Sequence, residues 1–272
     1  MSTASIPPAH DARALYVFCV ARAGVALPDG DGLDAAGSLH TVASAGLAAL
    51  VCEVALADFT GPGGEANLGD LAWLGPRALR HEAVIEAAMG RTAVLPLRFG
   101  CLFSAASAVE RWLARDAVAI TTFLERAAGH AEWSLRGWID VGACERALAA
   151  SDPRRAALPS SPGARYLAEQ RLRRDIAAGV APWTREVEAA LLTALGAAAR
   201  RLPARGDAMF ERRERQAFHL AVLAAPAEVA ALQARSEAVV ARWPDHGLAL
   251  EWTGPWPPYN FTPPLGEVDA GG

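Results

Sequence analysis

The chain has 272 residues, of which 52% are hydrophobic and 21% charged. This composition excludes a disordered or fibrous protein, and the length suits two domains of about 130 residues each. All 26 basic residues are arginines, and 30 acidic residues bring the net charge to −4. A mildly acidic total gives no indication of a nucleic-acid partner. No apolar run reaches the roughly eighteen residues of a bilayer-spanning helix, so we expect no lipid-membrane partner.

The cysteines and histidines show no pattern of a metal or redox centre. Four cysteines lie far apart between apolar neighbours, and we expect them to be buried, reduced thiols of a cytoplasmic protein: Cys19, Cys52, Cys101 and Cys144. No two histidines have metal-binding spacing. There is also no phosphate loop, dinucleotide fingerprint or nucleophile elbow. We therefore expect no cofactor, no metal and no enzymatic activity.

The first half of the chain alternates strand and helix patterns. Short apolar runs rich in β-branched and aromatic residues predict strands at 14–21, 47–56 and 94–99. Helical periodicity predicts a helix at 65–90, with Pro76 in a first turn, and another from Ser104 to about 128. Pro96 must lie at a sheet edge or a bulge, because it cannot donate to a ladder.

The second half follows a different order. The predicted elements are a strand at 132–141, a loop at 151–163, helices over 164–202, a short strand near 206–212, a strand at 216–224, a helix at 226–243 and a strand at 248–254. Gly179 and Pro182 should kink the long helical pattern or split it in two. This order is the βαββαβ plan of a ferredoxin-like domain with a long helical insertion.

We therefore predict an α+β protein of two domains. The N-terminal α/β-type domain spans 14–129, and the C-terminal ferredoxin-like domain spans 130–262, with its helices at 164–202. Residues 1–13 form a disordered leader and 263–272 a disordered tail.

Charged and titratable side chains are concentrated in residues 76–100, where His81 and Glu82 could form an acid–base site. Adjacent helical residues diverge by about 100°, however, so these two side chains cannot bond to each other on one face. We expect His81 to be half-buried on the apolar face and bonded to a backbone carbonyl. Glu82 or Glu86 should form a buried ion pair with Arg98 or Arg80, fixing helix against strand.

Two further segments could bind partners. The arginine-rich helix start at 165–174 includes Arg171, but interleaved acids and few aromatic residues favour a solvated face or an acidic protein over nucleic acid. The tail at 251–266 carries Trp252, Trp256 and Tyr259 among prolines. These aromatic rings either pack back across their own domain or form a docking strip for a partner.

Several motifs resemble one known family. They are DLAWLGPRALRHEAVIEAAMGRTAVLPLRFGCLF at 70–103, the opening strand ALYVFCVA, the segment EWSLRGWIDV, the helix start GARYLAEQRLRR and the ending LEWTGPWPPYNF. Together they span most of residues 14–262 and are similar to the gas vesicle protein F/L family.

This resemblance implies a non-enzymatic accessory protein of gas vesicles, which are cytoplasmic, gas-filled protein shells. It implies binding to the small, very hydrophobic main shell subunit and to other gas vesicle proteins, during nucleation and assembly, as a transient chaperone or as a minor wall component. Contacts would be hydrophobic and arginine-mediated, and the mean hydropathy of +0.15 is compatible with them. The signature residues are Trp73, Arg77, His81, Glu82, Arg98, Arg171, Trp252, Trp256 and Tyr259.

The residues alone leave a second function open. A ferredoxin-like sheet often binds small molecules, so the chain could be a ligand-binding regulatory module.

Overall fold

The computed structural model describes residues 12–34, 37–203 and 215–266, which form two compact units. One unit contains the described residues up to His130 together with those from Trp256 onward, and the other is Ala131–Pro255. The sequence pattern assigns residues 256–262 to the second domain, whereas in the structure they belong to the first unit. No helix of the described residues is long and apolar enough to cross a membrane.

The first unit is built on an antiparallel sheet in the order β2-β3-β1-β4, with β5 also paired to β1. Its strands are β1 (Arg13–Arg22), β2 (His40–Ser44), β3 (Leu47–Ala55), β4 (Leu95–Pro96) and β5 (Leu102–Phe103). All eight inner residues of β1 are buried, as expected for a strand covered on both faces.

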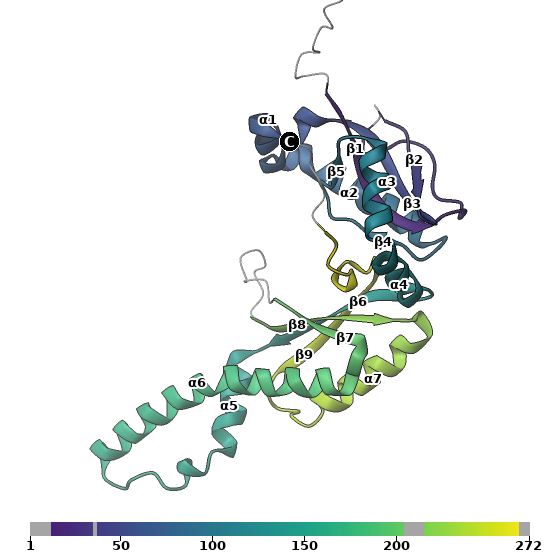
Figure 1. Ribbon diagram of the computed structural model, residues 1–272. Coiled ribbons are helices and arrows are strands. Elements are labelled where there is room, and N and C mark those ends of the chain that lie inside the picture. Colours follow the sequence, from purple (N-terminus) through teal and green to yellow (C-terminus); the bar gives the residue numbers. More distant parts are fainter. Residues whose placement is uncertain (1–11, 35–36, 204–214, 267–272) are drawn as a thin grey trace, which may run out of the picture. The chain divides into compact units, whose positions relative to one another are not determined.

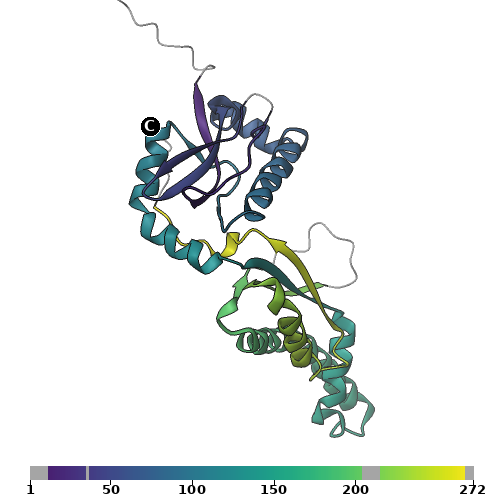
Figure 2. The same ribbon diagram turned by 90° about the vertical axis from the view of Figure 1, so that its right-hand side faces the viewer.

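Helices cover both faces of this sheet. They are α1 (Gly61–Gly69), α2 (Leu71–Met89), α3 (Ala106–Arg115) and α4 (Ala117–Ala127). Figure 2 shows α2 on one side of the sheet and α3 with α4 on the other. On the α2 side, Val84, Ile85 and Ala88 pack with Tyr16 and Phe18 of β1 in one buried core.

The single helix predicted at 65–90 is divided at Asp70 into α1 and α2. Asp70 is the N-cap of α2, and its carboxylate accepts a hydrogen bond of 2.9 Å from the Ala72 N–H. Pro76 therefore lies inside the helix, and its assignment to a first turn is wrong. At the other end, α2 ends at Met89 with Gly90 as its C-cap, within one residue of the predicted end.

Two other elements of the first unit are shorter than predicted. The strand expected at 94–99 is reduced to Leu95–Pro96, at the outer edge of the sheet order, where a proline is tolerated. The helix expected from Ser104 to 128 begins at Ala106 and is interrupted at Asp116. Arg13, placed in the leader by the sequence, begins β1; residues 1–11 and 267–272 lie outside the described residues.

The second unit is a four-stranded sheet in the order β7-β8-β6-β9. Its elements are β6 (Ala131–Ile139), α5 (Val141–Ser151), α6 (Pro162–Leu195), β7 (Ala199–Leu202), β8 (Arg215–Ala224), α7 (Val229–Val240) and β9 (Leu248–Trp256). Helices α6 and α7 lie against one face of the sheet (Figure 1), where Val187, Leu191 and Leu232 pack on Leu135 and Leu220.

Helix α6 differs from the sequence expectation. It is one helix of 34 residues that continues through Gly179 and Pro182. It ends at Leu195, and its C-cap Gly196 has a positive φ of 62°. A short 3-10 turn at Gly196–Ala198 then leads into β7, so the helix does not continue to 202. The short strand expected near 206–212 lies outside the described residues, and α5 was not predicted.

Candidate functional site

His81 is the centre of a buried polar cluster in the first unit. It lies on the face of α2 that carries Val84, Ile85 and Ala88, and its side chain is only 1% exposed. The expected apolar face is thus confirmed, but the ring is fully rather than half buried. At this depth both ring nitrogens need hydrogen-bond partners.

Both nitrogens have them. His81 Nε2 lies 3.1 Å from the backbone carbonyl oxygen of Leu97, which can only accept, so Nε2 carries the proton. Nδ1 is then an acceptor, and the Tyr16 hydroxyl donates to it at 2.8 Å. The predicted bond to a backbone carbonyl is confirmed. Because Leu97 N–H also donates to the Phe18 carbonyl at 2.9 Å, His81 joins α2 to the edge of the sheet.

Besides donating to His81, the Tyr16 hydroxyl accepts a hydrogen bond from the Gly100 N–H at 3.3 Å. Gly100 has φ of 87°, a conformation that disfavours residues with a side chain. The glycine that ends the LPLRFG motif thus turns the backbone so that its amide reaches the tyrosine.

Tyr259 links His81 and Glu82, whose side chains point in different directions from the helix. Its hydroxyl donates to Glu82 Oε1 at 3.0 Å, and its oxygen lies 3.2 Å from His81 Nε2. The nearby Phe261 is buried, with the Arg126 guanidinium 5.6 Å from its ring centre. These contacts fasten the C-terminal segment to the first unit.

Aromatic rings surround the cluster. Phe18 is stacked on His81 with centroids 5.7 Å apart, and Phe99 meets the ring edge-on at 5.7 Å. Phe59 contacts both Tyr16 and Phe99. The polar groups are therefore enclosed by hydrophobic surface, which favours their neutral forms.

Burial shifts the pKa of each group accordingly. Desolvation lowers the pKa of His81 to about 4, against a smaller opposing effect of the Leu97 carbonyl. Burial raises the pKa of Glu82, although the hydrogen bond from Tyr259 opposes the rise. The pKa values of Tyr16 and Tyr259 are also raised by burial. At neutral pH the imidazole is uncharged and both phenols keep their protons.

The expected ion pair between helix and strand is wrong. Among the described residues, no salt bridge joins Arg80 or Arg98 to Glu82 or Glu86. Arg80 instead donates to the backbone carbonyls of Asp31 and Gly32, while Glu82 accepts from Tyr259. Arg98 and Glu86 are exposed, because their positions turn away from the buried face of the helix and the sheet.

The remaining signature residues fall into separate places. The Arg77 guanidinium lies 4.3 Å from the Trp73 ring centre and donates to the Trp73 carbonyl at 3.1 Å. Arg171 is exposed on α6, and Trp252 packs against the core of the second unit. Trp256 is exposed. The structure thus brings together only His81, Glu82 and Tyr259, with the Trp73–Arg77 pair on the same helix.

Tyr16 was missed as a member of this cluster. A signal existed, since a tyrosine within the buried run ALYVFCVA needs a partner for its hydroxyl. The sequence could not name that partner, because His81 lies 65 residues away.

Within the described part of the chain, no group of three or more His, Cys, Asp or Glu side chains could hold a metal ion. Cys19, Cys52 and Cys144 are buried free thiols, as predicted, and Cys101 is only partly buried. Burial raises the pKa of Cys19 and Cys101 to about 12, so their reactive thiolate forms are disfavoured.

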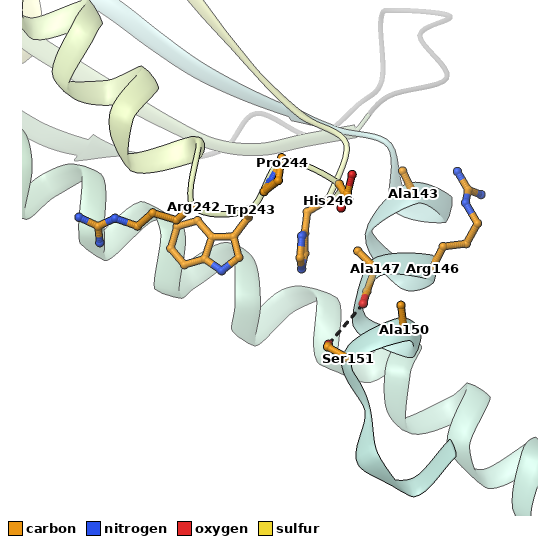
Figure 3. A pocket seen from close by; sticks show the side chains of 10 residues that line it. Ala143, Arg146, Ala147, Ala150, Ser151, Arg242, Trp243, Pro244 and His246 are labelled. Carbon is orange, nitrogen blue, oxygen red and sulfur yellow. Dashed lines mark hydrogen bonds between the residues drawn. The ribbon is translucent and has the colours of Figure 1, made fainter. Parts of the chain in front are cut away.

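A pocket of about 620 Å³ lies in the second unit. One wall is the small-residue side of α5, with Ala143 and Ala147, and the other is the loop after α7, with Trp243 and His246 (Figure 3). The His246 ring stacks on Trp183 at 4.7 Å, and its buried Nδ1 has no hydrogen-bond partner in the described part of the chain.

Comparisons with protein families and with curated proteins all match gas vesicle proteins. A family model described as "Gas vesicle synthesis protein GvpL/GvpF" matches residues 14–263. Gas vesicle protein L of Streptomyces sp. (strain CB03234) is 34% identical over 100 residues, which cover 37% of this chain and 38% of that protein. Gas vesicle protein L1 of Halobacterium salinarum (strain ATCC 700922 / JCM 11081 / NRC-1) is 27% identical over 201 residues, 69% of this chain and 70% of that one.

Solved structures share the fold. The gas vesicle protein GvpF from Anabaena sp. PCC7120 superposes with a TM-score of 0.61 and 18% identity, covering 92% of this chain and 98% of that one. GvpF from Microcystis aeruginosa superposes with a TM-score of 0.57 and 18% identity, covering 92% and 99%. The resemblance in the sequence motifs is confirmed by the family match across nearly the whole described chain. The chain belongs to the GvpL/GvpF family of gas vesicle synthesis proteins.

Proposed function

We propose that this protein is a gas vesicle accessory protein that binds the hydrophobic main shell subunit and takes part in vesicle nucleation and assembly. Membership of the GvpL/GvpF family supports the connection to gas vesicles. Its location would then be the cytoplasm and the vesicle, either as a transient chaperone or as a minor wall component. Probing purified vesicles for the chain separates these two, because only a wall component stays after washing.

The observation that carries this proposal is the exposed apolar side of α2. Leu71 and Leu79 are 81% and 75% exposed. Leu79 lies two residues before His81, about 200° around the helix, so it points away from the buried cluster. Large leucines left in water are costly, and an apolar shell subunit would cover them. The His81 cluster supports this surface by holding the opposite side of α2 on the sheet.

The test is capture of the main shell subunit by the purified full chain. We expect L71S/L79S to reduce capture strongly, because it removes the apolar contact without touching the core. V118S is the matched control, since Val118 is an 82% exposed apolar residue on α4 of the same unit. Equal capture by L71S/L79S and the unaltered chain would contradict the proposal.

We also propose that the His81 cluster is structural and that the protein is not an enzyme. Both ring nitrogens are occupied and the side chain is enclosed, which supports a packing role over general acid–base chemistry. We expect H81L to lower stability. An activity abolished by H81L, with stability unchanged, would contradict this proposal.

The second unit, in our proposal, is a ferredoxin-like domain. Its strand order β7-β8-β6-β9, with α5 and α6 after β6 and α7 after β8, supports the βαββαβ description with a helical insertion.

The pocket beside His246 favours a second candidate function, a ligand-binding regulatory module. His246 lines this pocket, and its imidazole could bond to a small molecule. A thermal-shift screen of metabolites on the unaltered chain and on H246A tests it. A ligand that raises the melting temperature only of the unaltered chain supports this function, and the absence of any such ligand contradicts it.

A further inference from the structure

The first half of α6 takes no part in the core of the second unit. The core uses α6 only from Val180 onward, together with Trp183, Val187 and Leu191. Before that point, α6 and the segment 152–161 extend beyond the sheet as a hairpin with α5 (Figure 1). Because this half of α6 adds little to the core, its exposed side chains are candidates for binding a partner.

Ion pairs hold this hairpin in place. Arg154 joins Asp152 at 2.8 Å and Asp175 at 2.7 Å, so the loop is tied to the side of α6. On α6 itself, Arg165 pairs with Glu169 at 3.0 Å. Every acidic residue of 152–176 is engaged by these two arginines.

Three arginines in the first half of α6 have no acidic partner among the described residues. Asp175 is four residues from Arg171, within helical reach, but it binds Arg154. Glu169 is four residues from Arg173, but it binds Arg165. Among the described residues, no salt bridge involves Arg171, Arg173 or Arg174. Like charges at such spacing repel each other, a cost that an anionic partner would relieve.

Apolar groups lie beside these charges. Leu167, Arg171 and Arg174 follow the i, i+4, i+7 spacing of a single helix face, while Leu172 and Ile176 are buried on the other side. Leu167 and its neighbour Tyr166 are 59% and 58% exposed. We call Tyr166, Leu167, Arg171, Arg173 and Arg174 the arginine face.

We propose that the arginine face binds an acidic, amphipathic helical segment of another protein. Carboxylates at helical spacing complement these three guanidinium groups, which have no acidic partner among the described residues although Arg174 Nε donates to the Gln170 carbonyl at 3.4 Å. Apolar side chains of the same segment cover Leu167 and Tyr166. Single-stranded RNA fits less well. Tyr166 is the one aromatic residue in 152–182, so a stacking platform is lacking, and the chain as a whole carries a charge of −4. The surface lies on α6 and is independent of the α2 leucines in the proposed function.

The test uses a fluorescent amphipathic helical peptide of Glu and Leu, about five turns long, titrated with the full chain. We expect salt-sensitive binding that weakens about tenfold or more in R171Q/R174Q, equivalent to at least about 1.4 kcal/mol. The control R185Q/R235Q removes the same charge from exposed positions on α6 and α7 and should retain the affinity. A peptide with Ser in place of Leu should bind more weakly.

Three results would overturn the proposal. One is no binding of the acidic peptide at low salt. Another is an equal loss in R171Q/R174Q and R185Q/R235Q, which would reduce the effect to net charge. The third is tighter binding of a single-stranded RNA of similar length than of the peptide. Circular dichroism of both variants serves as the control, because a loss of α6 would lower their helical content.

Discussion

The Tyr16 hydroxyl is held between one donor, the Gly100 N–H, and one acceptor, His81 Nδ1. Y16F removes both bonds and leaves the buried His81 Nδ1 without its partner, so we expect a loss of about 1–3 kcal/mol in the free energy of unfolding. Y166F is the control, because Tyr166 is exposed on α6 and should change stability by less than about 0.5 kcal/mol. Urea denaturation of both variants measures the difference; equal stability would contradict the buried assignment.

His81 should make the stability of the protein depend on pH. Its pKa falls from 6.5 to about 4 on folding, so below pH 6.5 the unfolded chain binds the proton more readily than the folded one. Above pH 6.5 His81 therefore costs no stability. As the pH falls from 6.5 toward 4, the free energy of unfolding decreases by about 1.4 kcal/mol per pH unit, and the loss reaches about 2 kcal/mol at pH 5. Glu82, whose pKa is raised by burial, acts in the opposite direction and reduces this loss.

The measurement is urea denaturation at pH 7, 6 and 5 of the unaltered chain and of H81L, which has no imidazole to titrate. We expect a smaller pH-dependent loss in H81L, although it starts from lower stability. The same slope in both proteins would show that His81 is not protonated on unfolding.

At the residue scale, the sequence predicted which helix face a side chain occupies better than it predicted its hydrogen-bond partners. Helical periodicity correctly placed His81 on the apolar face of α2 and separated it from Glu82. The arginine–glutamate pair was wrong because the pattern cannot show that the loop carbonyls of Asp31 and Gly32 lie closer to Arg80. Hydrogen-bond partners distant in sequence depend on the tertiary fold.

At the scale of elements, α6 offers a direct test. Pro182 has no N–H to donate to the carbonyl of residue 178, so the helix loses a hydrogen bond in its interior. We expect P182A to raise the free energy of unfolding by about 1–3 kcal/mol. P162A is the control, since Pro162 lies at the first position of the same helix, where proline is tolerated. An equal or lower stability of P182A would indicate that the proline ring makes packing contacts worth as much as the missing bond.

Long periodic segments were predicted well and short ones poorly. The strands β1, β3 and β8 were located within one residue, because buried apolar runs are a strong signal. Strand β9 was located within two residues, although none of its residues is fully buried. The short strands β2 and β7 were missed, since ladder pairing with β3 and β8 defines them more than their own residues do. Of the two outcomes predicted at Gly179 and Pro182, a kink or a split of the helix, the split is wrong. Packing of the residues that follow outweighed local propensity.

At the scale of the whole molecule, the first unit is built from two separate stretches of sequence, with the second unit between them. After completing the sheet of the second unit, the chain contributes residues from Trp256 onward to the first unit. Tyr259 bonds to Glu82 across 177 residues of sequence. The proline and aromatic content of the tail indicated that its rings must pack somewhere, but periodicity carries no information on which unit receives them.

The most direct test of the proposed role is gas vesicle formation in cells in which the chain is deleted and then restored. We expect deletion to abolish or sharply reduce vesicles counted by electron microscopy, and the unaltered chain and V118S to restore them. L71S/L79S, present at the same level, should not restore them, because the apolar side of α2 is lost. Normal vesicle numbers in the deletion strain, or full restoration by L71S/L79S, would contradict the account.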